Sequence, residues 1–160
     1  MWKKIAWATA GLALVALVGG FIYSNVTPAD QCDVCYRPLH AETYYRIHAT
    51  DGTALDVCCP RCGLRYQAGR EDVARTEVTD FETKALFDAE DAFYVEGSPV
   101  HFCSHAHVEE DRTGTQYEVS YDRCLPSLVA FQSREAAVRF ARQNGGVIKT
   151  MDELLKEPAL

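Results

Sequence analysis

The residues best suited to chemistry are seven cysteines, which form two CxxC pairs, one further cysteine next to the second pair, and two single positions. The pairs lie in "QCDVC" (31–35) and "CCPRC" (58–62), and Cys103 and Cys124 stand alone. A CxxC pair lets one turn present two sulfurs to a single ion. Thiolates favour Cu⁺ and Zn²⁺ because soft donors suit these ions. Seven is an odd number, so at least one thiol cannot join an intramolecular disulfide.

Two arrangements of the first five cysteines are typical of metal binding. The spacing of a four-thiolate zinc site is given by Cys32, Cys35, Cys59 and Cys62, which leaves Cys58 spare or as a substitute. Cys35, Cys58 and Cys62 instead give C-x22-C-x3-C, which is similar to the TRASH family of metal-trafficking and metal-sensing domains. Structural disulfides are an alternative, and so is thiol–disulfide exchange, although the sequence lacks the βαβ context that exchange motifs need.

A second set of donors lies in "VHFCSHAHV", residues 100–108. If this stretch is a strand, alternate side chains point to the same face. That face would carry four donors: His101, Cys103, His105 and His107. Such a strand spreads the four donors over about 20 Å, so they cannot all bind one ion. We expect two or three of them to bind an ion together with a ligand from elsewhere in the chain. Cys124 is the candidate for that ligand in a copper site. An exposed hairpin face that happens to carry histidines is the alternative.

The N-terminus predicts export of the rest of the chain. Residues 1–4 include Lys3 and Lys4, and the 19 residues that follow, 5–23, carry no charge. This length crosses the hydrocarbon core as a helix, and the preceding lysines place residues 1–4 in the cytoplasm. We therefore expect a single-pass anchor in the cytoplasmic membrane with the remaining chain in the periplasm or outside the cell. A cleaved signal peptide is the alternative. The net charge of −7 argues against nucleic acid as a partner.

The elements that position the cysteines are predicted to be short strands and two helices. After a linker at 24–30, the turn Asp51-Gly52 is flanked by two strand-like runs and predicts a β-hairpin. Pro60 fits the first turn of a helix that ends near Gly69. The remaining expected elements are strands at 76–81, 92–97 and 128–131, a hairpin around residues 109–114, a helix after Ser133 and a strand at 147–151.

Strand–strand–helix–strand thus occurs twice, around residues 44–81 and 115–151, which predicts an α+β fold with two similar halves. The first half, 31–97, carries the CxxC pairs. The second half, 98–155, carries the predicted His/Cys hairpin, and 156–160 form a tail.

The run from Thr79 onward resembles a known family. "TDFETKALFDAEDAFYV" and "LVAFQSREAAVRFARQNGGVIKTMDEL" closely resemble the NosL family of nitrous oxide reductase accessory proteins, which shows TDY-x-T, DA-x-x-AFYV and VAF-x-S-x-E-x-A-x-x-F followed by GG. The resemblance extends from Cys32 to about Leu155 and indicates a divergent, cysteine-rich member. Cys124 stands where the family has a methionine.

The resemblance implies a copper chaperone on the outer face of the cytoplasmic membrane. Such a chaperone delivers Cu⁺ to apo nitrous oxide reductase or to another exported copper enzyme, and its fold is a pair of ββαβ units similar to organomercurial lyase. In this interpretation Cu⁺ binds Cys103, Cys124 and one nearby histidine, while the CxxC pairs hold a structural Zn²⁺.

The alternative is a TRASH-like sensing or interaction module, stabilised by zinc or disulfides, that does not transfer copper. We do not expect an enzyme, because the sequence shows no nucleophile–base pair and no phosphate-binding loop.

Overall fold

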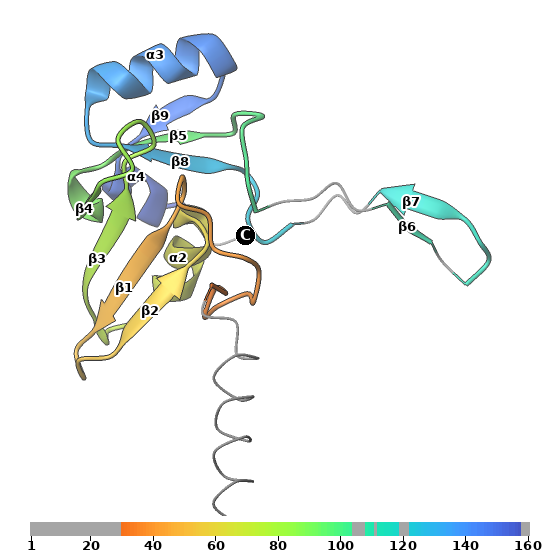
Figure 1. Ribbon diagram of the computed structural model, residues 1–160, viewed down its shortest axis with the longest axis horizontal. Helices are drawn as coiled ribbons and strands as arrows, with labels where there is room; N and C mark the ends of the chain where they lie inside the picture. Colours follow the sequence, from red (N-terminus) through yellow and green to blue (C-terminus); the bar gives the residue numbers. More distant parts are fainter. Residues whose placement is uncertain (1–29, 104–107, 111, 119–121, 158–160) are drawn as a thin grey trace, which may run out of the picture. The chain divides into compact units, whose positions relative to one another are not determined.

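The computed structural model describes residues 30–103, 108–110, 112–118 and 122–157 (Figure 1). From Gln31 onward the chain forms one compact unit. The predicted anchor, 5–23, lies outside the described residues. Within the part that is described, no helix is long and apolar enough to cross a membrane.

The first sheet contains four antiparallel strands in the order β2-β1-β3-β4. Its elements are β1 (Tyr45–Ala49), β2 (Ala54–Val57), α2 (Pro60–Gln67), β3 (Val73–Thr79) and β4 (Leu86–Asp88). The β1–β2 hairpin, and the helix that opens at Pro60, confirm the sequence-based prediction. Strand β4 was not predicted, because three residues are too short for an alternating pattern.

The second sheet has the order β8-β5-β9 and is antiparallel. Its strands are β5 (Phe93–Glu96), β8 (Leu128–Phe131) and β9 (Val147–Lys149), with α3 (Arg134–Asn144) against them (Figure 1). The 3-10 turn η1 (Ala89–Asp91) precedes β5, and α4 (Met151–Leu155) follows β9. Two ββαβ units are therefore present, β1-β2-α2-β3 and β5-β8-α3-β9, and the class is α+β as predicted.

Two details differ from the sequence-based expectation. The strand at 92–97, which we expected to close the first half, is the central strand β5 of the second sheet. It takes the place of the strand that we expected near residue 115 at the start of the second unit, because β7 pairs with β6 in a separate sheet. Met151 starts α4 instead of ending a strand, because Thr150 forms a capping box with Glu153 that opens a helix there.

A separate two-stranded sheet pairs β6 (Val108–Glu110) with β7 (Gln116–Glu118). The predicted hairpin around the acidic turn therefore exists. His101 and Cys103 precede it and lie outside any strand, so they do not share one strand face as expected. His105 and His107 lie outside the described residues.

The two ββαβ units are joined where β3 ends. The Phe81 amide donates to the Ala130 carbonyl in β8 at 2.9 Å. The Asp80 carboxylate accepts the Gln132 amide at 2.7 Å, just past β8. Arg61 in α2 forms an ion pair with Glu96 in β5. These contacts fix the end of the first sheet and α2, where three cysteines lie, against the second sheet.

Candidate metal centre

All seven cysteines carry free thiols, and their four chain segments converge on one buried region. Their sulfurs form two groups, within each of which all sulfurs lie within 4.8 Å of one another. The first group contains Cys32, Cys35, Cys58 and Cys62. A tetrahedral zinc ion with Zn–S bonds of about 2.3 Å places its sulfurs about 3.8 Å apart, so these separations suit a single ion.

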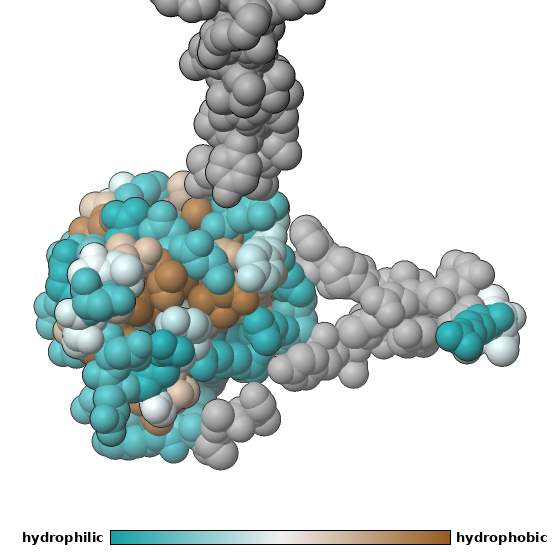
Figure 2. All heavy atoms as spheres, turned by 90° about the horizontal axis from the view of Figure 1, so that it is seen from below, coloured by the Kyte–Doolittle hydropathy of each residue, from teal (hydrophilic) through white to brown (hydrophobic). Residues whose placement is uncertain are grey.

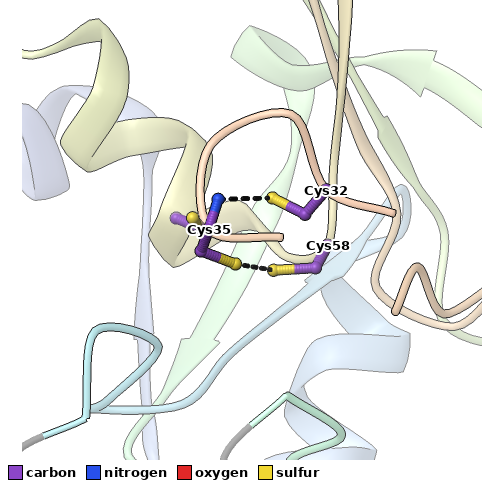
Figure 3. Close-up of side chains that lie close together, drawn as sticks. Cys32, Cys35 and Cys58 are labelled. Carbon is purple, nitrogen blue, oxygen red and sulfur yellow. Dashed lines mark hydrogen bonds between the residues drawn. The ribbon is translucent and has the colours of Figure 1, made fainter. Parts of the chain in front are cut away.

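The loop that carries Cys32 and Cys35 is folded by its own backbone. The Cys32 amide donates to the Arg37 carbonyl at 2.8 Å, and the Tyr36 amide donates to the Cys32 carbonyl at 2.9 Å. Tyr36 takes a left-handed conformation, with φ of 62°, to close the turn. The Cys35 amide then points at the Cys32 sulfur at 3.4 Å, and the Cys35 sulfur lies 3.4 Å from that of Cys58 (Figure 3). The turn thus presents both sulfurs to the same place.

The junction of β2 and α2 supplies the next three sulfurs. Cys58 follows β2, Cys59 is the N-cap of α2, and Cys62 lies in the first turn of the helix. The helix lies very close to β1 because Gly63 has no side chain: a Cβ there would meet the Tyr45 ring at 2.4 Å. Close packing of α2 on β1 therefore holds Cys62 beside the N-terminal loop.

The second group contains Cys58, Cys59, Cys103 and Cys124. Cys58 belongs to both groups, and its sulfur is 3.9 Å from that of Cys59 and 4.0 Å from that of Cys124. Cys103 and Cys124 come from the two ends of the excursion 104–121, which carries β6 and β7. A cavity of about 10 Å³, the size of one water molecule, is lined by Cys59, Cys103, Cys124 and the exposed His101.

Arg37 in the N-terminal loop forms hydrogen bonds with Cys103 and Asp122, which lie at the two ends of the segment 104–121. Its Nη1 donates to the Cys103 carbonyl at 2.6 Å and to Asp122 Oδ1 at 2.7 Å, and lies 3.6 Å from the Cys124 sulfur. Asp122 also accepts the Cys124 amide at 2.7 Å. The hydrogen bond to Asp122 raises the pKa of Arg37, so a permanent positive charge lies beside the second group.

Hydrogen bonds among the thiols shift the pKa values of individual cysteines in opposite directions. Hydrogen bonds from Cys58 and Cys62 lower the pKa of Cys32. Hydrogen bonds from Cys103 and Cys58 lower the pKa of Cys124. Hydrogen bonding to Cys103 and Cys124 raises the pKa of Cys58. The thiolate form is therefore favoured at Cys32 in the first group and at Cys124 in the second. Cys58, which belongs to both groups, keeps its proton until a metal ion replaces it.

The sequence-based candidate residues are partly regrouped by the fold. The predicted set Cys32, Cys35 and Cys62 does come together, but its fourth member is Cys58, which we expected to be spare or to substitute for Cys59. The alternative C-x22-C-x3-C arrangement did include Cys58. Cys59 instead joins Cys103 and Cys124. Of the histidines, His101 lines the small cavity without belonging to either four-sulfur group. Spacing alone could not separate Cys58 from Cys59, because adjacent cysteines fit a CxxC or a CxxxC pattern equally.

Comparison with known proteins places this geometry in a known fold. No family model matches the chain. A curated relative, the HTH-type transcriptional repressor CutR of Bacillus subtilis (strain 168), is 22% identical over 147 residues, which cover 90% of this chain and 67% of the relative. The crystal structure of the copper chaperone NosL from Shewanella denitrificans matches with a TM-score of 0.56 and 15% identity, covering 80% of this chain and 91% of that one. The chain therefore has a NosL-like fold, as its sequence indicated.

Proposed function

We propose that this protein is a Cu⁺ chaperone of the exported compartment, held at the membrane by residues 5–23. The observation that carries the proposal is the convergence of seven free, mostly buried thiols inside a NosL-like fold. A solved structure with this fold is that of a copper chaperone. Thiolates select soft ions, so copper and zinc are the candidate ions.

The second group is the proposed cargo site, and the first group is the proposed site of a structural Zn²⁺. Cys103 and Cys124 flank an excursion of the chain, and the exposed His101 lines the cavity beside them. A ligand from a client protein can approach such a site and displace one sulfur at a time. Nitrous oxide reductase, or another exported copper enzyme, is the proposed client.

A metal-responsive interaction module is the second candidate. It is favoured by the relative that is named a transcriptional repressor, which aligns with nine-tenths of this chain. Such a module would use the same thiols to sense or hold an ion without passing it on. The two functions differ in whether bound copper leaves for an acceptor.

The assignment of the cargo site is tested by anaerobic titration of the full chain with Cu⁺ against a competing chelator. We expect Cys103→Ser with Cys124→Ser to weaken Cu⁺ binding by at least about tenfold, since two of four sulfurs are lost, and to leave retained zinc unchanged. The matched control is Cys32→Ser with Cys35→Ser, which should lose the zinc. Unchanged Cu⁺ affinity in the first double variant would exclude the second group as the cargo site.

A further inference from the structure

We propose that the seven cysteines form one binuclear metal–thiolate centre in which the Cys58 sulfur bridges two ions. The inference rests on the proposed metal-binding function and adds the number of ions and the identity of the bridging residue. It arises from the geometry of the two four-sulfur groups, which share Cys58 and no other residue.

The number of sulfurs supports a shared ligand. Two closed four-coordinate thiolate sites need eight sulfurs if they are separate. The chain has seven cysteines, and all of them belong to the two groups. With Cys58 counted in both, each ion obtains four sulfurs and none is left over. The odd number of cysteines, which excludes complete disulfide pairing, is the number that a centre with one bridging thiolate requires.

The position of Cys58 also fits a bridge. Its sulfur lies 3.4 Å from that of Cys35 in the first group and 4.0 Å from that of Cys124 in the second. A sulfur bonded to two ions at about 2.3 Å each holds them roughly 3.8 Å apart, which is typical of two-metal sites in proteins. Cys58 has no exposed surface. Ions on either side of it would therefore share a sulfur that is shielded from bulk solvent.

Cys58 is held in place by contacts that do not use its sulfur. The Thr43 hydroxyl donates to the Cys58 carbonyl at 2.9 Å, and Cys58 directly follows the last residue of β2. The rigid end of a hydrogen-bonded strand thus carries the bridging residue. The outer ligands come from the N-terminal loop on one side and from the ends of the excursion on the other.

The negative charge of the bound thiolates is favoured by groups that lie beside them. When ions bind, each S–H bond is replaced by a sulfur–metal bond and the proton goes to solvent, with no change of oxidation state. Seven thiolates carry more charge than one Zn²⁺ with one Cu⁺, and more than two Zn²⁺, and buried excess charge is costly. The N-terminus of α2 at Cys59 favours negative charge at the centre. Arg37, which is paired with Asp122, also lies 3.6 Å from the Cys124 sulfur.

The test uses the full reduced chain loaded with cadmium-113, a stand-in for Zn²⁺ that prefers four thiolates. Native mass spectrometry counts the ions, and cadmium NMR reports whether they share a sulfur. We expect two Cd²⁺ per chain, two resonances, and a splitting of each that arises from coupling through the bridge. Cys58→Ser should abolish the splitting. Cys35→Ser, which removes a sulfur from one group only, should keep it while shifting one resonance.

The other outcomes separate this inference from the proposed function. One Cd²⁺ per chain, or two Cd²⁺ without coupling in the wild type, would overturn the bridge and leave a metal-binding protein. A splitting that survives in Cys58→Ser would assign the bridge to another residue and overturn the inference. Absence of any bound ion in the folded, reduced chain would overturn both.

Discussion

Protons and metal ions compete for the same sulfurs at the level of single residues. Burial raises the pKa of Cys35, and hydrogen bonding to neighbouring sulfurs raises the pKa of Cys58 and Cys62. These three thiols are therefore protonated at neutral pH when no ion is bound. Because a metal needs the thiolate, each of them must lose its proton on binding.

Metal affinity should accordingly rise with pH. As the pH increases, less free energy is needed to remove protons from thiols whose pKa is raised, so the affinity for Zn²⁺ should increase from about pH 6 to about pH 8. Titration of the reduced chain in weak buffer with a pH indicator measures the protons released, and a chelator competition measures the affinity. Cys35→Ser should release fewer protons than the wild type. A pH-independent affinity without proton release would contradict the raised pKa values.

At this scale the sequence indicated which cysteines are candidate metal ligands, but not which sulfurs lie together. The sequence indicated that Cys103 and Cys124 act together, and their sulfurs do lie in one group. It could not show that Cys58 lies between the groups, since that depends on how α2 packs on β1. The predicted partner histidines depended on a strand that the chain around His101 does not form.

The contacts that join the two sheets act at the level of elements. Asp80, which is only 3% exposed, follows β3 and accepts the Gln132 amide at 2.7 Å and the Thr83 amide at 2.7 Å. Burial alone would raise the pKa of Asp80, but the hydrogen bonds from Gln132 and Thr83 outweigh it and hold the pKa below its usual value. The ionised carboxylate therefore links the first sheet to the second.

Replacing this carboxylate should lower stability in a pH-dependent way. Because the folded pKa of Asp80 is depressed, its contribution is present above the unfolded pKa of about 4 and is lost as the pH falls through the folded value. Asp80→Asn should lower the free energy of unfolding by about 1–3 kcal/mol at pH 7 and by less in acid. Urea unfolding at several pH values measures this. The exposed Asp72→Asn is the control, and an equal loss at all pH values would contradict the assignment.

The two ββαβ units could be predicted from strand and helix periodicity, whereas their exact membership could not. Strand β5 pairs with β8 and β9, although more than 30 residues separate β5 from β8 along the chain. A short-range pattern assigns a strand to its neighbours in sequence, so it placed 92–97 in the first half. The intervening excursion begins and ends at the second sulfur group, and this long-range arrangement is decided by packing.

At the scale of the whole molecule, the cysteine sulfurs lie beneath the surface. On the face shown in Figure 2 the described residues are mainly hydrophilic, with apolar residues gathered near the middle. The net charge of −7 suits association with a cation more than with nucleic acid. Six of the seven cysteines are buried, and Cys35 is half-buried, so the sulfurs are shielded from bulk solvent.

Transfer of copper tests the central claim most directly. The full chain, reduced and loaded with one Cu⁺, would be mixed anaerobically with apo nitrous oxide reductase, and the copper content of each protein would be measured after separation. We predict that Cu⁺ moves to the acceptor from the wild type, and that the double variant Cys103→Ser with Cys124→Ser delivers much less. Retention of the copper by the wild type in the presence of apo copper acceptors would contradict the chaperone function and favour a module that binds metal without giving it up.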